Sequence, residues 1–209
     1  GLHLNLTEGP GLSSSFKTYP SLQKLMLLSA LRLLKQPVIE AEINLQLDRF
    51  INHFGTLPDY IDGHLHVVQL PVIRKAVLKI YRERLQQTKT YIRSTFTPKR
   101  QSVKAKIIHL TGAKAFKRSL EKATIPHNEA LIGNYDFKKA PKFDQLFPEF
   151  LKAAVESSII LCHPGHQSKD YPNDPSAHIR TYEYAYLNSD KFLKDCEKES
   201  VKIGRFNAS

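Results

Sequence analysis

The sequence predicts an α/β fold built on a parallel β-sheet. Segments with a strand pattern alternate with segments of helical pattern about five times along the 209 residues, as in a series of βα units. No linker divides the chain and no short repeat is present, so we expect one domain over residues 1–209. An α/β barrel is the main prediction, and a doubly wound open sheet is the alternative. The predicted strands lie at 1–8, 58–67, 90–94, 130–133, 158–163 and 201–206, and the predicted helices at 20–35, 37–53, 71–87, 102–122, 143–156, 180–188 and 190–199.

Composition places the chain among ordinary globular proteins. Hydrophobic residues make up 41% of it and charged residues 24%. No apolar run approaches the roughly 20 residues that a membrane-spanning helix needs. The two cysteines, Cys162 and Cys196, are too few for a disulfide scaffold and indicate a reducing compartment. We therefore expect a cytoplasmic protein with no membrane partner, and the sequence leaves open whether it forms a homo-oligomer.

The formal net charge of +11 is concentrated in one region. Between Lys89 and Lys122 ten lysines and arginines stand against one acid, Glu121. Such a block suits nucleic acid or another anionic surface, but no nucleic-acid-binding motif accompanies it. The solvated face of a basic helix is the favoured interpretation, and nucleic acid is not the expected partner. Gly-x-Gly-x-x-Gly and P-loop sequences are also absent, which argues against nucleotide-dependent chemistry.

Residues 1–8 alternate strictly between apolar and polar side chains. Leu2, Leu4 and Leu6 are expected on one face of a strand. His3 lies on the other face, together with polar neighbours. By itself a histidine in a strand is most often a residue without a functional role, but this setting makes His3 a candidate ligand.

The segment 58–67 is predicted to be the central strand and contains the most informative pattern. Because side chains alternate along a strand, Asp62, His64 and His66 are expected to share one face. Leu65 and its apolar neighbours are expected on the other. A carboxylate and two imidazoles on one face can hold a divalent metal or move protons. A surface strand with scattered histidines is the competing interpretation.

Two further candidate residues lie at predicted strand ends. The apolar run 158–163 reads as a buried parallel strand that ends at His163, ahead of a Pro-Gly turn. Arg93 lies near the end of the short strand 90–94. The polar, proline-containing stretch 165–179 is expected to be a mobile loop over the site. Cys162 points away from His163 and is expected to be a buried, inert thiol.

These residue types suit metal-assisted hydrolysis. A catalytic divalent ion needs a few protein ligands and open positions for water and substrate. His3 and His64 come from strands that are expected to be near neighbours. A further histidine would protonate the leaving group, and a carboxylate would accept the proton of the attacking water. These parts suit the hydrolysis of an amide or an ester, but they do not identify the substrate.

The motifs resemble those of the YdjC-like carbohydrate deacetylases along essentially the whole chain. The matching segments are Gly-Leu-His-Leu-Asn-Leu-Thr-Glu-Gly at 1–9, Glu42-Ile43 and Gln46 before Phe50, Gly55 and Pro58, Ile-Asp-Gly-His-Leu-His-Val at 61–67, and Leu-Cys-His-Pro-Gly at 161–165. The motifs at 1–9 and 61–67 are specific together, whereas His-Pro-Gly alone is weak.

The resemblance implies a distorted (β/α) barrel and metal-dependent removal of acetyl groups from N-acetylated sugars such as chitooligosaccharides. It implies that His3 and His64 bind a divalent metal, Mg²⁺ or Zn²⁺. It assigns His163 as the general acid and Asp62 as a second catalytic residue. His66 and Arg93 match positions that are expected to contact the N-acetylated oligosaccharide substrate. The alternative role for Arg93 is to orient a catalytic carboxylate.

One part of the family pattern is missing from the sequence. The family begins with a strand Asn-Ala-Asp-Asp-Phe-Gly, which supplies the metal-binding aspartate, and no such sequence occurs here. There is no initiating methionine, so we expect the chain to be amino-terminally incomplete. The main hypothesis is a metal-dependent carbohydrate deacetylase. The alternative is a non-catalytic carbohydrate-binding or structural barrel that has lost the catalytic strand.

Overall fold

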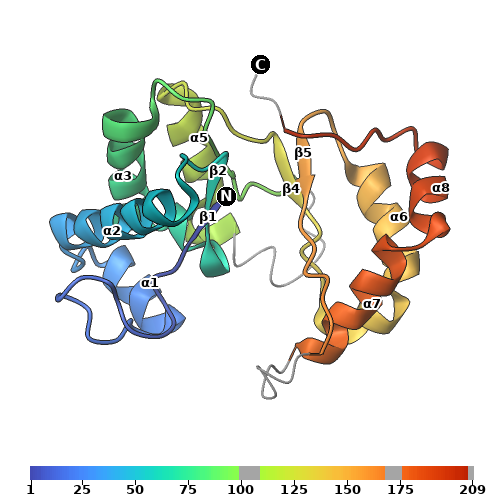
Figure 1. Cartoon of the computed structure of the whole chain (residues 1–209), viewed down its shortest axis with the longest axis horizontal. Coiled ribbons are helices and arrows are strands. Elements are labelled where there is room, and N and C mark those ends of the chain that lie inside the picture. Colours follow the sequence, from blue (N-terminus) through green and yellow to red (C-terminus); the bar gives the residue numbers. More distant parts are fainter. Residues whose placement is uncertain (99–108, 168–175, 207–209) are drawn as a thin grey trace. The chain divides into compact units, whose positions relative to one another are not determined.

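The computed structural model describes residues 1–98, 109–167 and 176–206. These residues fall into two compact units (Figure 1). The first contains residues 1–96 and 109–128, and the second contains 97–98, 129–167 and 176–206. The predictions for residues 102–108 and for most of the loop 165–179 lie outside the described residues.

The first unit is built on a parallel sheet of three strands in the order β1-β2-β3. The strands are short: β1 is Leu2–Leu4, β2 is Tyr60–Gly63 and β3 is Tyr91–Ile92. The parallel pairing predicted from the alternation of elements is confirmed. Leu2 and Leu4 point into the core while His3 is exposed, as the alternation predicts. The strand predicted over residues 1–8 ends at Leu4, however, and Thr7, one of the polar residues of the pattern, is buried.

Helices cover this sheet. They are α1 (Leu22–Ala30), α2 (Gln36–Phe54), α3 (Pro71–Ile80), which continues into a π-helical turn (Tyr81–Leu85), and α5 (Lys114–Lys122) after a second such turn (His109–Ala113). The ends of α2 follow from local chemistry. Pro37 occupies the first turn, where its missing N–H costs nothing, and Gly55 closes the helix in the left-handed conformation that glycine adopts easily.

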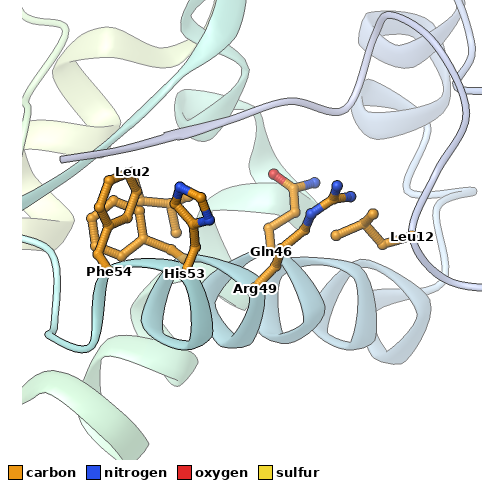
Figure 2. A pocket seen from close by; sticks show the side chains of 7 residues that line it. Leu2, Leu12, Gln46, Arg49, His53 and Phe54 are labelled. Atoms are coloured by element: carbon orange, nitrogen blue, oxygen red, sulfur yellow. The ribbon is translucent and has the colours of Figure 1, made fainter.

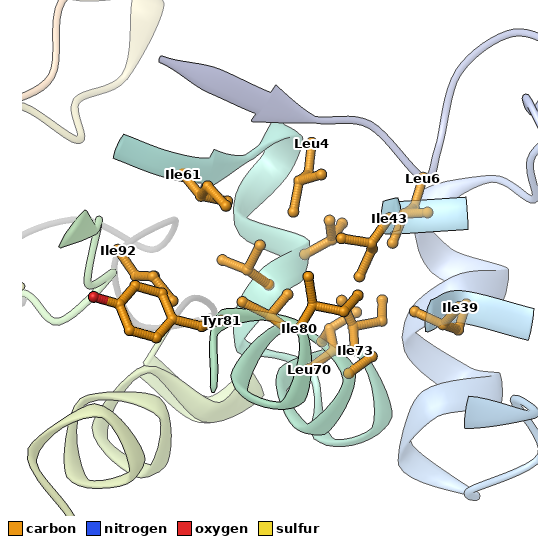
Figure 3. Close-up of a cluster of buried hydrophobic side chains, with 14 of the residues drawn as sticks. Leu4, Leu6, Ile39, Ile43, Ile61, Leu70, Ile73, Ile80, Tyr81 and Ile92 are labelled. Carbon is orange, nitrogen blue, oxygen red and sulfur yellow. The ribbon is translucent and has the colours of Figure 1, made fainter. Parts of the chain in front are cut away.

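The buried core of the first unit lies between the sheet, α2 and α3 (Figure 3). Ile39, Ile43 and Leu47 lie on the inward stripe of α2 and are at most 1% exposed. The predicted stripe of the first helix is only partly correct. Leu25 is buried, whereas Leu27 and Leu31 are each 59% exposed, because α1 is short and packs through one narrow face.

A buried carboxylate ties the loop that follows β1 to α2. Glu42 is fully buried and accepts hydrogen bonds from the backbone N–H of Leu12 at 2.9 Å and of Ser13 at 2.8 Å. It also accepts a short hydrogen bond from the Tyr19 hydroxyl. Burial raises the pKa of this carboxyl, but the three donors outweigh burial and lower the pKa to about 2. Glu42 therefore anchors the loop as an ionised group.

An open pocket of about 420 Å³ lies beside the edge strand (Figure 2). It is lined by Leu2 of β1, by Leu12 of the loop and by side chains of α2 that include Arg49 and Phe54. Leu2 lies on the face of β1 opposite to His3, so the pocket is separate from the candidate site described below.

The second unit has a two-stranded parallel sheet, β4 (Ala130–Ile132) with β5 (Ser158–Ile160). Its helices are α6 (Phe143–Ala153), α7 (Ala177–Leu187) and α8 (Asp190–Lys198), which contact one another around an aromatic core. Phe143, Phe147 and Tyr186 form ring contacts with centroid separations of 5.3 to 5.7 Å. The run 158–163 is half-buried rather than fully buried, and residues 201–206 form no strand, contrary to the prediction.

The predicted class, an α/β protein with parallel strands and covering helices, is confirmed in both units. The two small sheets establish parallel strand pairing, but they do not establish the closed barrel that was predicted. No helix in the described part of the chain is both long enough and apolar enough to cross a bilayer.

Candidate active site

The register of β1 and β2 brings the first two site residues together. His3 is the direct partner of Asp62 in the parallel ladder, so their side chains leave the sheet on the same face. The Nδ1 atom of His3 lies 2.6 Å from Oδ1 of Asp62. Two segments that are 59 residues apart in sequence thus meet in one hydrogen bond.

The next strand supplies a cation to the same carboxylate. The backbone N–H of Arg93 donates to the carbonyl oxygen of Ile61 at 3.0 Å, which extends the ladder by one residue beyond β3. Nη2 of Arg93 then lies 2.7 Å from Oδ2 of Asp62. Burial would raise the pKa of the Asp62 carboxyl, but the hydrogen bond with His3 and the charge of Arg93 outweigh it and hold the pKa below its usual value.

The structure corrects the prediction that the central strand extends to residue 67. The strand ends at Gly63, and His64–Gln69 forms a 3₁₀ turn in which Leu65 and His66 adopt left-handed backbone angles, with φ of 50° and 60°. A Cβ atom on Gly63 would overlap the side chain of Val68, so the chain turns back tightly here. Asp62, His64 and His66 therefore do not share a strand face. Leu65 is 45% exposed rather than inward.

The turn still brings His64 to His3. The Nε2 atom of His3 lies 3.3 Å from Nδ1 of His64, and the two rings meet edge to face at 5.5 Å. The His3 side chain is 55% exposed and that of His64 30% exposed, so a ligand can reach the pair from solvent. The predicted proximity of these two imidazoles is confirmed, through the turn rather than through a regular strand.

Each ring has one nitrogen that faces the other histidine and one outer nitrogen that faces away from it. A carboxylate lies at the outer nitrogen of each ring. Asp62 binds Nδ1 of His3, and Oε1 of Glu8 lies 3.2 Å from Nε2 of His64. A neutral imidazole carries one proton, and a neighbouring carboxylate favours the proton on the nitrogen that it faces. When both rings are neutral and carry their protons on these nitrogens, the two nitrogens that face each other both present lone pairs. Such a pair is stabilised by one additional proton or by a metal cation between them.

The pair fits two positions of a metal site. When two nitrogens bind one ion at about 2.1 Å each, the distance between them depends on the N–metal–N angle. It is about 3.0 Å at a right angle and about 3.4 Å at the tetrahedral angle. The observed 3.3 Å falls within this interval. Histidine ligands typically donate their outer N–H to a carboxylate, as His3 does to Asp62. Three or more histidine, cysteine, aspartate or glutamate side chains do not converge on a common metal position within the described residues.

The two predicted substrate contacts lie around Asp62. His66 is 8% exposed, and its charge contributes to the low pKa of Asp62. Arg93 is 5% exposed, and its Nε and Nη1 have no hydrogen-bond partner among the described residues. A buried guanidinium that uses only part of its donor fork retains donors for an oxygen-bearing ligand.

His163 belongs to the second unit. It follows β5, and its backbone N–H donates to Oε2 of Glu183 on α7. Its ring contacts that of Phe137 edge to face, with centroids 5.8 Å apart. Burial, followed by the charge of Glu183, raises the pKa of the neighbouring Cys162 thiol to about 12. Cys162 is therefore an inert thiol, as its apolar surroundings predict.

Sequence reasoning missed two carboxylates near these histidines, Glu8 and Glu183. Glu183 was detectable, because it lies on the inward helical stripe with Ile179 and Tyr186, where a charge requires a specific partner. Glu8 had no distinctive signal, since it is a surface acid that reaches His64 only through the turn after β1.

The fold and the site define an α/β protein in which parallel strands present histidine, aspartate and arginine side chains at their carboxyl ends, where such folds carry their sites. The chain belongs to the YdjC-like protein family, whose model matches residues 1–198.

Two known proteins illustrate the relationship. A carbohydrate deacetylase of Danio rerio is 34% identical over 89 residues, a match that covers 38% of this chain and 28% of that protein. The matched region thus spans little more than a quarter of the curated relative. A crystal structure from Enterococcus faecalis V583, of a protein assigned to cellobiose-phosphate cleavage, is 16% identical with a TM-score of 0.68. That match covers 98% of this chain and 75% of the other, and it supports the fold alone.

Proposed function

We propose that the protein is a metal-dependent carbohydrate deacetylase that removes acetyl groups from N-acetylated sugars such as chitooligosaccharides. The observation that carries the proposal is the facing pair of imidazole nitrogens, His3 Nε2 and His64 Nδ1, at 3.3 Å. Membership of the YdjC-like family and the similarity to a carbohydrate deacetylase support the same chemistry.

In this proposal His3 and His64 hold a divalent metal, Mg²⁺ or Zn²⁺. When bound, such an ion supplies an activated water and polarises the acetyl carbonyl group. The pair provides two protein ligands. By resemblance, the family's third ligand is the aspartate of an Asn-Ala-Asp-Asp-Phe-Gly strand, which does not occur in this sequence.

We propose that Asp62 orients the His3 ring as a metal ligand. With Oδ1 on His3 and Oδ2 on Arg93, both of its oxygens are engaged. This geometry favours orientation of the His3 ring over uptake of a proton, so we propose Asp62 as a positioning carboxylate within the catalytic group. Its negative charge also favours a cation nearby.

The remaining residues act on the substrate. Arg93 retains two buried donors, which suit an oxygen of the acetyl group or of the sugar. His66 is proposed as a second substrate contact. In the reaction, water loses a proton to a base as it adds to the acetyl carbon, the C–N bond breaks, and the amine nitrogen gains a proton as acetate leaves. We propose His163 as the donor of that proton.

The test is acetate release from N,N′-diacetylchitobiose by the full-length protein with Mg²⁺ or Zn²⁺. We expect release that stops with a chelator and returns when metal is added. His64→Ala is expected to lower the rate at least 100-fold, whereas His53→Ala, an exposed histidine on α2, serves as the matched control. Release that persists in His64→Ala would contradict the proposal.

A second candidate is a non-catalytic carbohydrate-binding protein. The observation that favours it is that the described residues bring together two, not three, side chains suited to a metal. This alternative predicts binding of the chitooligosaccharide, measured by calorimetry, without release of acetate under any metal condition. Binding with turnover would exclude it.

A further inference from the structure

A buried negative charge on α7 lies next to His163. Glu183 is completely inaccessible to solvent. An ionised carboxylate in such surroundings is stable only when donors satisfy it. Two donors do so: the Tyr135 hydroxyl at 2.6 Å from Oε1 and the backbone N–H of His163 at Oε2. Burial, then the hydrogen bond and charge of Glu183, raises the pKa of the Tyr135 hydroxyl, which therefore remains a donor.

The segment that carries His163 has left the sheet. Its last ladder bond is made by the N–H of Leu161, which donates to Ile132 at 2.8 Å. Beyond this point α7 provides the anchors, since Glu183 accepts from His163 and the carbonyl oxygen of Arg180 accepts from Gly165 N–H at 3.2 Å. A charge-assisted hydrogen bond to a buried carboxylate is the stronger type. Glu183 thus restrains the backbone at His163 directly.

We propose that Glu183 is a positioning residue that fixes the backbone, and through it the imidazole, of His163 for proton transfer. This inference rests on the proposed function, because the proposed role of His163 as acid gives the position its importance. Glu183 does not touch the substrate in this scheme. It acts by holding one N–H, and Tyr135 holds the other oxygen of the carboxylate in place.

The first test is spectroscopic and needs no turnover. An amide proton bonded to a buried carboxylate resonates far downfield and exchanges slowly. In Glu183→Ala we expect the His163 amide proton to move upfield and to exchange at least 10-fold faster. In Glu183→Gln, which is nearly isosteric and keeps a carbonyl acceptor, we expect a smaller change. Tyr186→Phe is the control, because Tyr186 lies on the same helix as Glu183 and its hydroxyl donates to the Asp195 carboxylate. We expect this substitution to leave the signal of the His163 amide proton unchanged.

The second test is kinetic, with N,N′-diacetylchitobiose as substrate. Because misplacement of a reacting group by about 1 Å can cost about 100-fold, Glu183→Ala is expected to lower kcat 10- to 100-fold with KM changed less than about twofold. Glu183→Gln is expected to recover most of the loss. In a His163→Ala background the same Glu183→Ala change has no further effect, because a positioning residue has nothing left to position.

The outcomes are separable. A His163 amide signal that is the same in Glu183→Ala and Glu183→Gln as in the parent overturns the positioning role. So does a loss of kcat that adds fully to that of His163→Ala, which would indicate general damage to the unit. If Glu183→Ala does not fold, Glu183→Gln alone decides, by the same signal and the same double substitution. Full activity of His163→Ala would instead overturn the proposed role of the acid, whatever the amide signal shows.

Discussion

Replacement of Glu42 with glutamine is expected to remove a pH-dependent part of the stability of the first unit. The carboxylate accepts from Leu12, Ser13 and Tyr19 in a fully buried position. Glutamine has the same shape but only one accepting oxygen, so its NH₂ group must face a donor. At least one of these donors is then left without an acceptor.

The lowered pKa of Glu42 gives the size of the expected loss of stability. A fall from 4.5 to about 2 corresponds to about 3 kcal/mol of stabilisation at neutral pH, at about 1.4 kcal/mol per pKa unit. Because the pKa of Glu42 is depressed in the folded protein, this stabilisation is complete above pH 4.5 and disappears as the pH falls towards 2. The difference between parent and Glu42→Gln is therefore expected to shrink from about 3 kcal/mol at pH 7 to about 1 kcal/mol near pH 3.

The assay is urea unfolding followed by circular dichroism between pH 3 and 7, with amide exchange at Leu12 and Ser13 as a local readout. Glu83→Gln is the matched control, since the Glu83 side chain is 53% exposed and such changes fall within about 0.5 kcal/mol. A Glu42→Gln variant as stable as the parent at pH 7, or a difference that does not change with pH, would refute the reasoning.

Three further substitutions test the site and its supports. Asp62→Asn is expected to weaken Zn²⁺ binding, measured by calorimetry, about 10- to 100-fold, because the amide orients His3 less strongly; unchanged affinity would argue against metal binding at this pair. Gly133→Ala is expected to cost more than about 2 kcal/mol in urea unfolding, since φ is 93° and the new Cβ would overlap the carbonyl oxygen of Leu161; a neutral result would contradict this close approach. Leu65→Gly is expected to stabilise the first unit by about 0.5 kcal/mol in thermal unfolding, because the left-handed backbone at Leu65 costs more than the added chain entropy; a lower melting temperature would show that the leucine side chain contributes more than its strain costs.

The helical stripes and helix ends could be read from the sequence because their causes are local. The repeat of Ile39, Ile43 and Leu47 predicts the buried face of α2, and Gly55 predicts its end. The alternation of Leu2, His3 and Leu4 likewise predicts which side of β1 faces the core. These features depend on residues within a few positions of each other, where side-chain period and backbone preference decide.

The end of the central strand could not be read in this way. Asp62, His64 and His66 have the spacing of a strand face, yet the chain leaves the sheet at Gly63. Leu65 and His66 take backbone angles that neither residue prefers. Tertiary packing overrides the local preference, with Val67 and Val68 buried in the core at 1% and 0% exposure.

The sequence by itself determined the α/β class, the parallel strands and the choice of His3 and His64 as partners, because hydrophobic period and motif spacing carry that information. The tertiary structure alone decided how those partners meet. The register of β1 on β2 sets His3 against Asp62, the turn after Gly63 swings His64 to within 3.3 Å, and Glu183 reaches His163 from a helix 20 residues away. Contacts between distant segments depend on register and packing, which no local pattern encodes.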